Sequence, residues 1–192
     1  MTVDRALDLL EQTLNGMAPA HKARLIHRDI KPANILLTER GEIRIADFGI
    51  AKAPDGQHSA VSQLGIGSRN YMAPEQREST KHVDARADVY SLAVLTYQML
   101  TGKLPTRRYA DPNDHCAALG SALNRVILKA RSVNKCGRFQ DAAEFNAVLK
   151  SARLQQQQSD SDTQTYTDVS PATTSTISPR LQPLAQLIDR HC

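Results

Sequence analysis

The stretch HRDIKPAN at residues 27–34 and the tripeptide DFG at residues 47–49 decide how this chain folds. Two short runs of β-forming residues lie between them, at 35–37 and 43–45, and the connection between the runs contains Gly41 as a turn residue. Short apolar runs on either side of a glycine-containing turn predict a β-hairpin. The sequence thus places acidic, basic and amide side chains directly before one small hairpin and an acidic side chain directly after it.

The register of this hairpin has a chemical consequence. If Ile35 lies opposite Ile45, then Asn34 faces Ala46, and directly opposed residues lie about 4.5–5.5 Å apart at Cα. Asp47 then follows directly after the partner of Asn34. A hard divalent cation requires oxygen ligands that are gathered in this way from distant parts of the sequence.

Helical periodicity accounts for most of the remaining chain. Apolar residues at helical spacing predict helices over 3–20, 119–130 and 140–149. Residues 85–101 are apolar on most sides, which predicts a buried central helix that ends at Gly102. The fold class predicted from the residues is therefore α+β and mostly α.

Three segments show no such pattern. Residues 47–75 form a long, glycine-containing loop, and loops of this length in compact domains are usually functional. Residues 103–117 are predicted to be a loop with little room for a helix. From 153 to 192 the composition turns to Gln, Ser, Thr and Asp, which predicts a disordered tail after a folded unit at 1–152.

Composition excludes several classes of protein. A net charge of +4 without a basic, aromatic-rich stripe argues against nucleic-acid binding. No apolar run approaches the roughly 18–20 residues that span a membrane, and the charged first residues do not form a secretory leader. Three cysteines without CxxC spacing indicate reduced thiols, so a cytoplasmic location is expected.

The motifs resemble the C-terminal catalytic lobe of bacterial, eukaryotic-like (Hanks-type) serine/threonine protein kinases. The resemblance covers roughly residues 6–149 and implies a kinase-like C-lobe with a single small hairpin. It also implies a short strand at Leu25-Ile26. The motifs that carry it follow in order along the chain: HRD at 27–29 with Asn34, DFG at 47–49, APE at 73–75, DVYSL at 88–92 and the pair Arg138-Phe139.

The resemblance assigns roles to five residues and implies ATP and Mg²⁺ as cofactors. Asp29 would be the base that accepts or orients the substrate hydroxyl proton, and Lys31 would contact the transferring phosphate. Asn34 and Asp47 would be the metal ligands. Leu36 would lie beneath the adenine ring, although a simple core role explains an apolar residue at this position equally well.

Other matching residues are expected to be structural. His27 would support the backbone of the metal-binding segment, and Phe48 would be an apolar plug against a further lobe or part of the core. Glu75 and Arg138 would form a buried ion pair. Asp88 would anchor the backbone of the catalytic loop.

Regulation is expected in the loop that follows the DFG tripeptide. Arg28, directly before Asp29, is suited to pair with a phosphorylated side chain in that loop. Ser59 and Ser62 are the candidate phosphorylation sites, and ordinary solvated serines are the alternative.

The sequence contains neither the glycine-rich phosphate loop G-x-G-x-x-G nor the V-A-I-K strand of the kinase N-lobe. Three explanations stay open: a truncated gene or wrongly assigned start, a lobe that works with a separately encoded N-lobe, and a kinase-like module without turnover. The expected function is serine/threonine protein kinase, acting on protein Ser or Thr. The alternative is an inactive interaction or regulatory module. Residues 1–192 alone are expected to bind ATP weakly and to have negligible kinase activity, because the N-lobe would supply the adenine roof, the phosphate-positioning lysine and the glycine loop.

Overall fold

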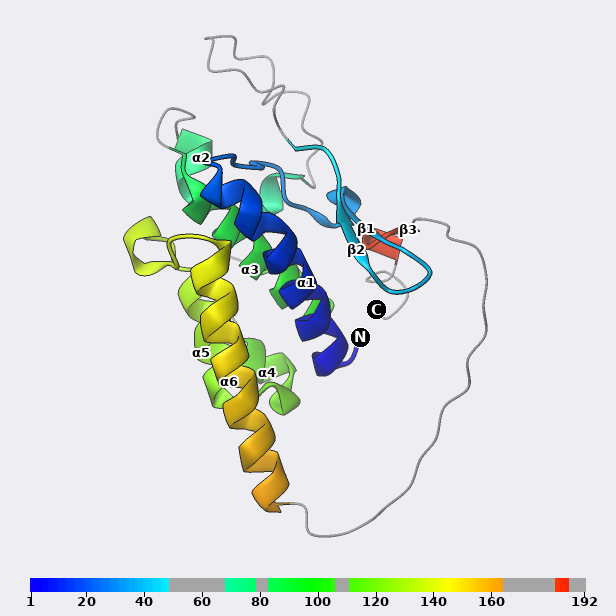
Figure 1. Cartoon of the computed structure of the whole chain (residues 1–192). Coiled ribbons are helices and arrows are strands. Elements are labelled where there is room, and N and C mark those ends of the chain that lie inside the picture. The colour runs from blue at the N-terminus through cyan, green and yellow to red at the C-terminus, as the bar shows by residue number, and fades with distance from the viewer. Residues whose placement is uncertain (49–67, 79–82, 106–110, 164–181, 187–192) are drawn as a thin grey trace.

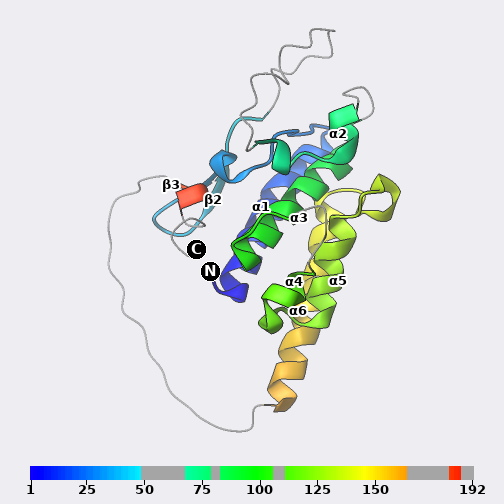
Figure 2. The same cartoon turned by 180° about the vertical axis from the view of Figure 1, so that it is seen from behind.

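The structure is a computed structural model and describes residues 1–48, 68–78, 83–105, 111–163 and 182–186. Figure 1 shows the arrangement, and Figure 2 shows it from behind. The longer elements are α1 (Val3–Lys22), β1 (Ile35–Leu37), β2 (Ile43–Ile45), α2 (Pro74–Glu78), α3 (Ala85–Thr101), α4 (Pro112–His115), α5 (Ser121–Ala130), α6 (Ala142–Thr163) and β3 (Gln182–Pro183). The 3₁₀ turns are η1 (Pro32–Asn34), η2 (Ser68–Asn70), η3 (Ala117–Leu119) and η4 (Lys135–Gly137).

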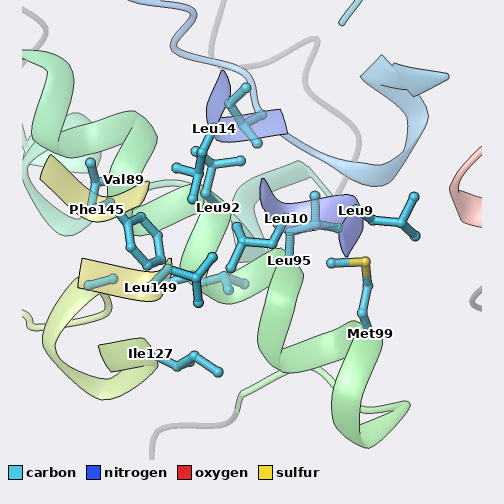
Figure 3. Packing of buried hydrophobic residues seen from close by; sticks show 14 of the residues in the cluster. Leu9, Leu10, Leu14, Val89, Leu92, Leu95, Met99, Ile127, Phe145 and Leu149 are labelled. Carbon is cyan, nitrogen blue, oxygen red and sulfur yellow. The ribbon is translucent and has the colours of Figure 1, made fainter. Parts of the chain in front are cut away.

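The core lies between helices from distant parts of the sequence. α1 packs against both α3 and α6, and α5 packs against α3 and α6. Figure 3 shows how side chains from these helices meet. Residues with almost no exposed surface include Leu10, Leu14, Leu92, Ile127 and Phe145. Burial of such side chains is the main favourable contribution to folding.

α3 is the predicted central helix and has the predicted bounds, Ala85–Thr101. The Asp84 side chain caps its N-terminus by accepting from the Arg86 N–H at 3.1 Å. Gly102 ends the helix in the left-handed conformation, at φ 70°, which a glycine adopts without steric cost. Thirteen of its residues are buried, which explains why no amphipathic pattern was visible in its sequence.

α1 continues past the predicted end to Lys22, with Pro19 inside the helix. Its buried face includes Leu14, Met17 and His21, so tertiary packing outweighs the weak helix-forming residues near this end. Gly16 has a packing role, because a Cβ atom there would lie 3.1 Å from Cδ1 of Ile45. The absence of a side chain lets the hairpin approach the helix closely.

The predicted hairpin and its register are confirmed. Ile35 pairs with Ile45 and Leu37 with Ile43 in an antiparallel arrangement. The sheet is larger than predicted, because β3 adds to the other edge of β1 and gives the order β2-β1-β3. Leu184, directly after β3, is buried.

Three other expectations are wrong in detail. Residues 25–26 are not a strand, and the Leu25 N–H instead closes the end of α1 by donating to the Ala20 carbonyl at 2.8 Å. The segment predicted to be a loop at 103–117 contains α4. Asp111 and Asp114 form a capping box around α4, and Pro112 occupies its first turn.

The boundary predicted at residue 153 also differs from the structure, because α6 continues to Thr163. Contacts with α1 and with η3 hold the first turn of this extension. The Arg153 guanidinium donates to Asp8 at 2.8 Å and to Glu11 at 3.1 Å. Gln156 donates to the Ala118 carbonyl at 2.9 Å. Glutamine and arginine are also good helix formers, a tendency that the composition argument overlooked.

Within the described ranges, no helix combines the length and the apolar character that a membrane crossing needs.

Candidate active site

The hairpin brings Asn34 and Asp47 together as its register predicts. Asn34 is the last residue of η1, directly before β1, and its carbonyl accepts from the Ala46 N–H at 2.9 Å. Asp47 follows directly with a φ of 55°, so the chain turns sharply there. This left-handed conformation is uncommon outside glycine. The Asp47 side chain is exposed at the surface beside the strand pair.

His27 clamps the start of this loop to the segment before Asp47. The Asp29 N–H donates to Nδ1 of His27 at 3.3 Å, so the ring proton lies on Nε2, which donates to the Ala46 carbonyl at 2.9 Å. The ring also packs on Phe48, with centroids 4.7 Å apart. His27 is fully buried. In this position it holds the backbone that leads to Asp47 and does not face a reactant.

Asp29, Lys31 and Asn34 form one hydrogen-bonded cluster. Nζ of Lys31 lies 2.9 Å from Oδ2 of Asp29. The Asn34 amide nitrogen donates to the Asp29 carbonyl at 2.7 Å and contacts Oδ2 of Asp29 at 3.3 Å. The Asp29 and Lys31 side chains are 18% and 20% exposed, so both are reachable from solvent yet held in place.

Asp88, in the first turn of α3, anchors the backbone of the loop that begins at His27. Its carboxylate accepts from the backbone N–H groups of His27 at 2.7 Å and Arg28 at 2.8 Å. Arg28 has a φ of 66°, a strained conformation for a residue with a side chain. The hydrogen bonds to a fully buried carboxylate hold the chain in that conformation.

His21 completes this anchor, and the sequence analysis missed it. Nε2 of His21 lies 3.0 Å from Asp88, while Nδ1 accepts from the Ala142 N–H at 3.0 Å. The ring therefore joins α1 to α3 and to the first residue of α6. A signal was present in the sequence, because the apolar stripe at Leu14 and Met17 continues at helical spacing to position 21.

Gln76 is a second missed anchor. Its amide nitrogen donates to the Arg28 carbonyl at 3.0 Å, and its amide oxygen accepts from the Ala73 N–H at 3.1 Å. One side chain thus ties α2 to the loop at Arg28. An exposed-looking glutamine in a five-residue helix carries no sequence signal for this role.

Glu75 and Arg138 form a two-pronged ion pair, with distances of 2.6 Å and 2.9 Å. The Arg138 side chain has no exposed surface. Its other N–H groups donate to backbone carbonyls, including those of Ser132 at 2.7 Å and Arg86 at 3.0 Å. The pair fastens α2 to α3 and to the segment before α6.

The oxygen donors fit a magnesium–nucleotide complex. Because the Asn34 amide nitrogen is turned toward Asp29, its oxygen is the atom left to ligate a cation. Asp47 adds an exposed carboxylate. Mg²⁺ is usually held by one or two protein oxygens together with phosphate oxygens. The described part of the chain holds no cluster of three or more His, Cys, Asp or Glu residues that could hold a metal ion.

Three other predicted site residues are Leu36, Ser59 and Ser62. Leu36 lies in β1 between Arg44 and Pro183, and it is partly exposed. The candidate phosphorylation sites Ser59 and Ser62 lie outside the described residues.

Comparison with known proteins agrees with this geometry. A sequence profile described as "Protein kinase domain" matches residues 1–178. The chain belongs to the protein kinase domain family. Its curated relatives are bacterial serine/threonine kinases, so the predicted resemblance to Hanks-type bacterial kinases is confirmed.

Serine/threonine-protein kinase PknB of Mycobacterium tuberculosis is 34% identical over 165 residues, covering 78% of this chain and 26% of that protein. A probable serine/threonine-protein kinase of Clostridium perfringens, CPE1738, is 37% identical over 145 residues, covering 68% of this chain and 21% of that protein. The chain therefore spans about a quarter of the length of the curated relatives it matches.

Among solved structures, the PknI kinase domain of Mycobacterium tuberculosis superimposes with a TM-score of 0.61 and 29% identity, covering 79% of this chain and 56% of that domain. The shared architecture is the protein kinase fold, and this chain corresponds to little more than half of it.

Proposed function

We propose that this chain is the catalytic lobe of a protein serine/threonine kinase, which transfers a phosphoryl group from ATP to Ser or Thr hydroxyls of a protein substrate. The observation that supports this most directly is the cluster in which Lys31 and Asn34 both contact the Asp29 carboxylate. Asn34 also pairs through its backbone with Ala46, the residue directly before Asp47. These are the chemical groups that phosphoryl transfer requires.

Asp29 is proposed to accept or orient the proton of the attacking hydroxyl. Its carboxylate is reachable from solvent, and contacts from Lys31 and Asn34 fix its direction. Lys31 carries a positive charge beside that carboxylate and is proposed to hold the phosphoryl group as it moves toward the substrate oxygen. Positioning and charge stabilisation of this kind supply most of the catalysis in phosphoryl transfer.

Asn34 and Asp47 are proposed to hold Mg²⁺, and Leu36 is proposed to lie against the adenine ring. A bound magnesium ion would neutralise the charge that develops on the phosphates. On the protein side, the Asn34–Ala46 backbone bond keeps the two ligands together, and His27 holds the same backbone from the other side.

The proposed complete enzyme needs a nucleotide-binding lobe, in the same polypeptide or in a partner, because residues 1–192 contain no glycine-rich phosphate loop. Regulation is proposed through phosphorylation of Ser59 or Ser62, with Arg28 as the phosphate-binding cation. Since ATP is the proposed donor, the proposed place of action is the cytoplasm.

The test is transfer of radiolabel from ATP to a protein substrate. We expect transfer when a bacterial kinase N-lobe is supplied, fused ahead of residue 1 or added in trans, and very little with the chain alone. Asp29→Asn should abolish transfer, while the surface change Glu42→Gln should leave it unchanged. Undiminished transfer by Asp29→Asn would contradict the assignment of the base.

The alternative is a kinase-like module that binds a partner without turnover. The absence of the G-x-G-x-x-G and V-A-I-K motifs from the sequence favours it. The same assay distinguishes the two functions, because such a module would give no transfer with any supplied N-lobe.

A further inference from the structure

The C-terminal segment lies directly beside the proposed nucleotide site. β3 pairs antiparallel with β1, with Pro183 opposite Leu36 and Gln182 opposite Leu37. The Leu184 N–H donates to the Ile35 carbonyl at 2.8 Å. Figure 1 shows β3 on the far side of β1 from β2. β1 and β3 are almost 150 residues apart in the sequence.

The two faces of β1 have different surroundings. Ile35 is fully buried and Leu37 is 9% exposed, whereas Leu36 between them is partly exposed, as expected for a strand with one face on the core. Leu184 is 1% exposed and belongs to the same core cluster as Ile35. Pro183 is partly exposed.

Directly opposed residues in an antiparallel pair point to the same face. Pro183 therefore stands beside Leu36 on the face that is open to a ligand, and Arg44 stands on its other side. Side chains on adjacent strands lie side by side, so neither Pro183 nor Arg44 covers Leu36. The proline ring widens the apolar surface that Leu36 presents.

We propose that residues 182–184 are part of the nucleotide-binding site. Leu184 braces β1 from the core side, and Pro183 extends the apolar floor on which the base lies against Leu36. This inference rests on the proposed function, because it concerns the same nucleotide site.

The bracing role follows from what β3 supplies to β1. Without β3, the Ile35 carbonyl loses its donor, and the outer edge of β1 is left unpaired. Asn34, the proposed magnesium ligand, directly precedes this strand. A looser β1 would place both Asn34 and Leu36 less accurately, and small errors in position are costly in catalytic sites.

The experiment compares three variants of the full chain that introduce the same charge. Leu184→Asp puts a carboxylate in the core and should release β3. Pro183→Asp changes the open face while Leu184 remains in place. Gln186→Asp is the matched control, because Gln186 is exposed.

Amide hydrogen exchange without ligand tests the brace. In Leu184→Asp, exchange at residues 34–37 should become at least about tenfold faster, which reports local opening of β1. Protection in α3 should stay the same, which would show that the lobe remains folded. The control should match the unmodified chain. Unchanged exchange at residues 34–37 would overturn the bracing role.

Titration with Mg-ATP, followed by NMR to detect weak binding, tests whether Pro183 contributes to the apolar surface under the base. Leu184→Asp and Pro183→Asp should each weaken binding by about threefold or more, as loss of a small apolar contact would. Unchanged or tighter binding in Pro183→Asp would overturn the role of that residue. If the unmodified chain bound no nucleotide, the role of Pro183 in this site would be contradicted. Radiolabel transfer with a supplied N-lobe would still decide the proposed function, and amide exchange would still decide the bracing role.

Discussion

The carboxylates of Asp88 and Asp47 have opposite surroundings. Asp88 is fully buried and accepts from two backbone N–H groups and from His21. Asp47 is exposed. A buried carboxylate has to be fully satisfied within the protein, because its desolvation is otherwise too costly. An exposed carboxylate keeps its contact with solvent and can meet a ligand there.

The difference separates residues that shape the site from residues that act in it. Asp88, Glu75 and Arg138 hold the loop and α2 on the core, so their replacement should affect folding first. Asp47 is exposed, and the Asp29 carboxylate contacts Lys31 and Asn34 of its own loop, so their replacement should affect chemistry and leave folding nearly unchanged. Four predictions test this division, and they are ordered by their expected effect on stability.

Arg138→Met should have the largest effect on stability. It leaves the Glu75 carboxylate unpaired and several backbone carbonyls without donors. Removing one partner of a buried pair typically costs about 3–5 kcal/mol. Urea unfolding followed by circular dichroism measures the loss.

The matched control for this prediction is Arg44→Met. The Arg44 side chain is 63% exposed and pairs with Glu42 at the surface, so the change should be within about 0.5 kcal/mol. Equal effects of the two substitutions would show that burial of Arg138 does not determine its contribution.

Asp88→Asn should cost about 2 kcal/mol, in the range of a lost hydrogen bond to a charged group. The amide keeps one acceptor oxygen but places an N–H₂ group against donors from the backbone and from His21. Amide exchange of His27 and Arg28 should accelerate, because the Asp88 carboxylate is their acceptor. Normal protection at both amides would contradict the anchoring role.

Asp84→Ala should cost about 1 kcal/mol at neutral pH, because it removes the N-cap of α3. The Arg86 side chain, which donates to the Asp84 carboxylate at 2.6 Å and 2.9 Å, lowers the pKa of Asp84 to about 2. This pKa lies below the value of about 3.9 in the unfolded chain. The charge of Asp84 therefore contributes fully to stability above a pH of about 3.9, and this contribution is lost as the pH falls toward 2.

The measurement for Asp84 is the difference in unfolding free energy between the two proteins at several pH values. The difference should shrink between pH of about 4 and about 2. The side chain is 41% exposed, so solvent screening keeps the charge contribution below about 1 kcal/mol. A difference that grows as the pH falls would contradict this assignment.

Asp29→Asn and Asp47→Asn should have the smallest effect on stability, within about 0.5 kcal/mol, because Asp47 is exposed and the Asp29 carboxylate contacts near neighbours in the sequence. Both should nevertheless remove phosphoryl transfer when an N-lobe is supplied. Thermal unfolding and the radiolabel assay on the same preparations test the two statements together. A large loss of stability in either variant would place that residue with the structural group.

The sequence was sufficient for the parts of the fold that follow from local pattern. The pairing of β1 with β2 was predictable because two short apolar runs lie on either side of one turn glycine, and the register considered for it is the one in the structure. The bounds of α3 were predictable because a nearly continuous apolar run ends at Gly102. The position of Asp47 beside Asn34 follows from that register.

What the sequence did not predict depends on contacts between distant segments. The pairing of β3 with β1 joins residues with no shared local pattern. The extension of α6 is held by ion pairs from Arg153 to α1, and a polar composition suggested disorder instead. Helical spacing indicated that position 21 is buried, but it could not indicate that His21 contacts Asp88, and no spacing rule links Gln76 to the Arg28 carbonyl.

Asn34 and Asp47 are proposed to gather a divalent cation and its nucleotide at the hairpin. Mn²⁺ with ATP serves as a paramagnetic probe of this site in the unmodified chain, followed by NMR. We expect selective broadening of the Asn34 side-chain amide and of the Ala46 and Asp47 backbone amides, and we expect Asp47→Asn to remove it. Broadening that survives Asp47→Asn, or that centres on α5 and α6, would show that these two residues do not hold the cation.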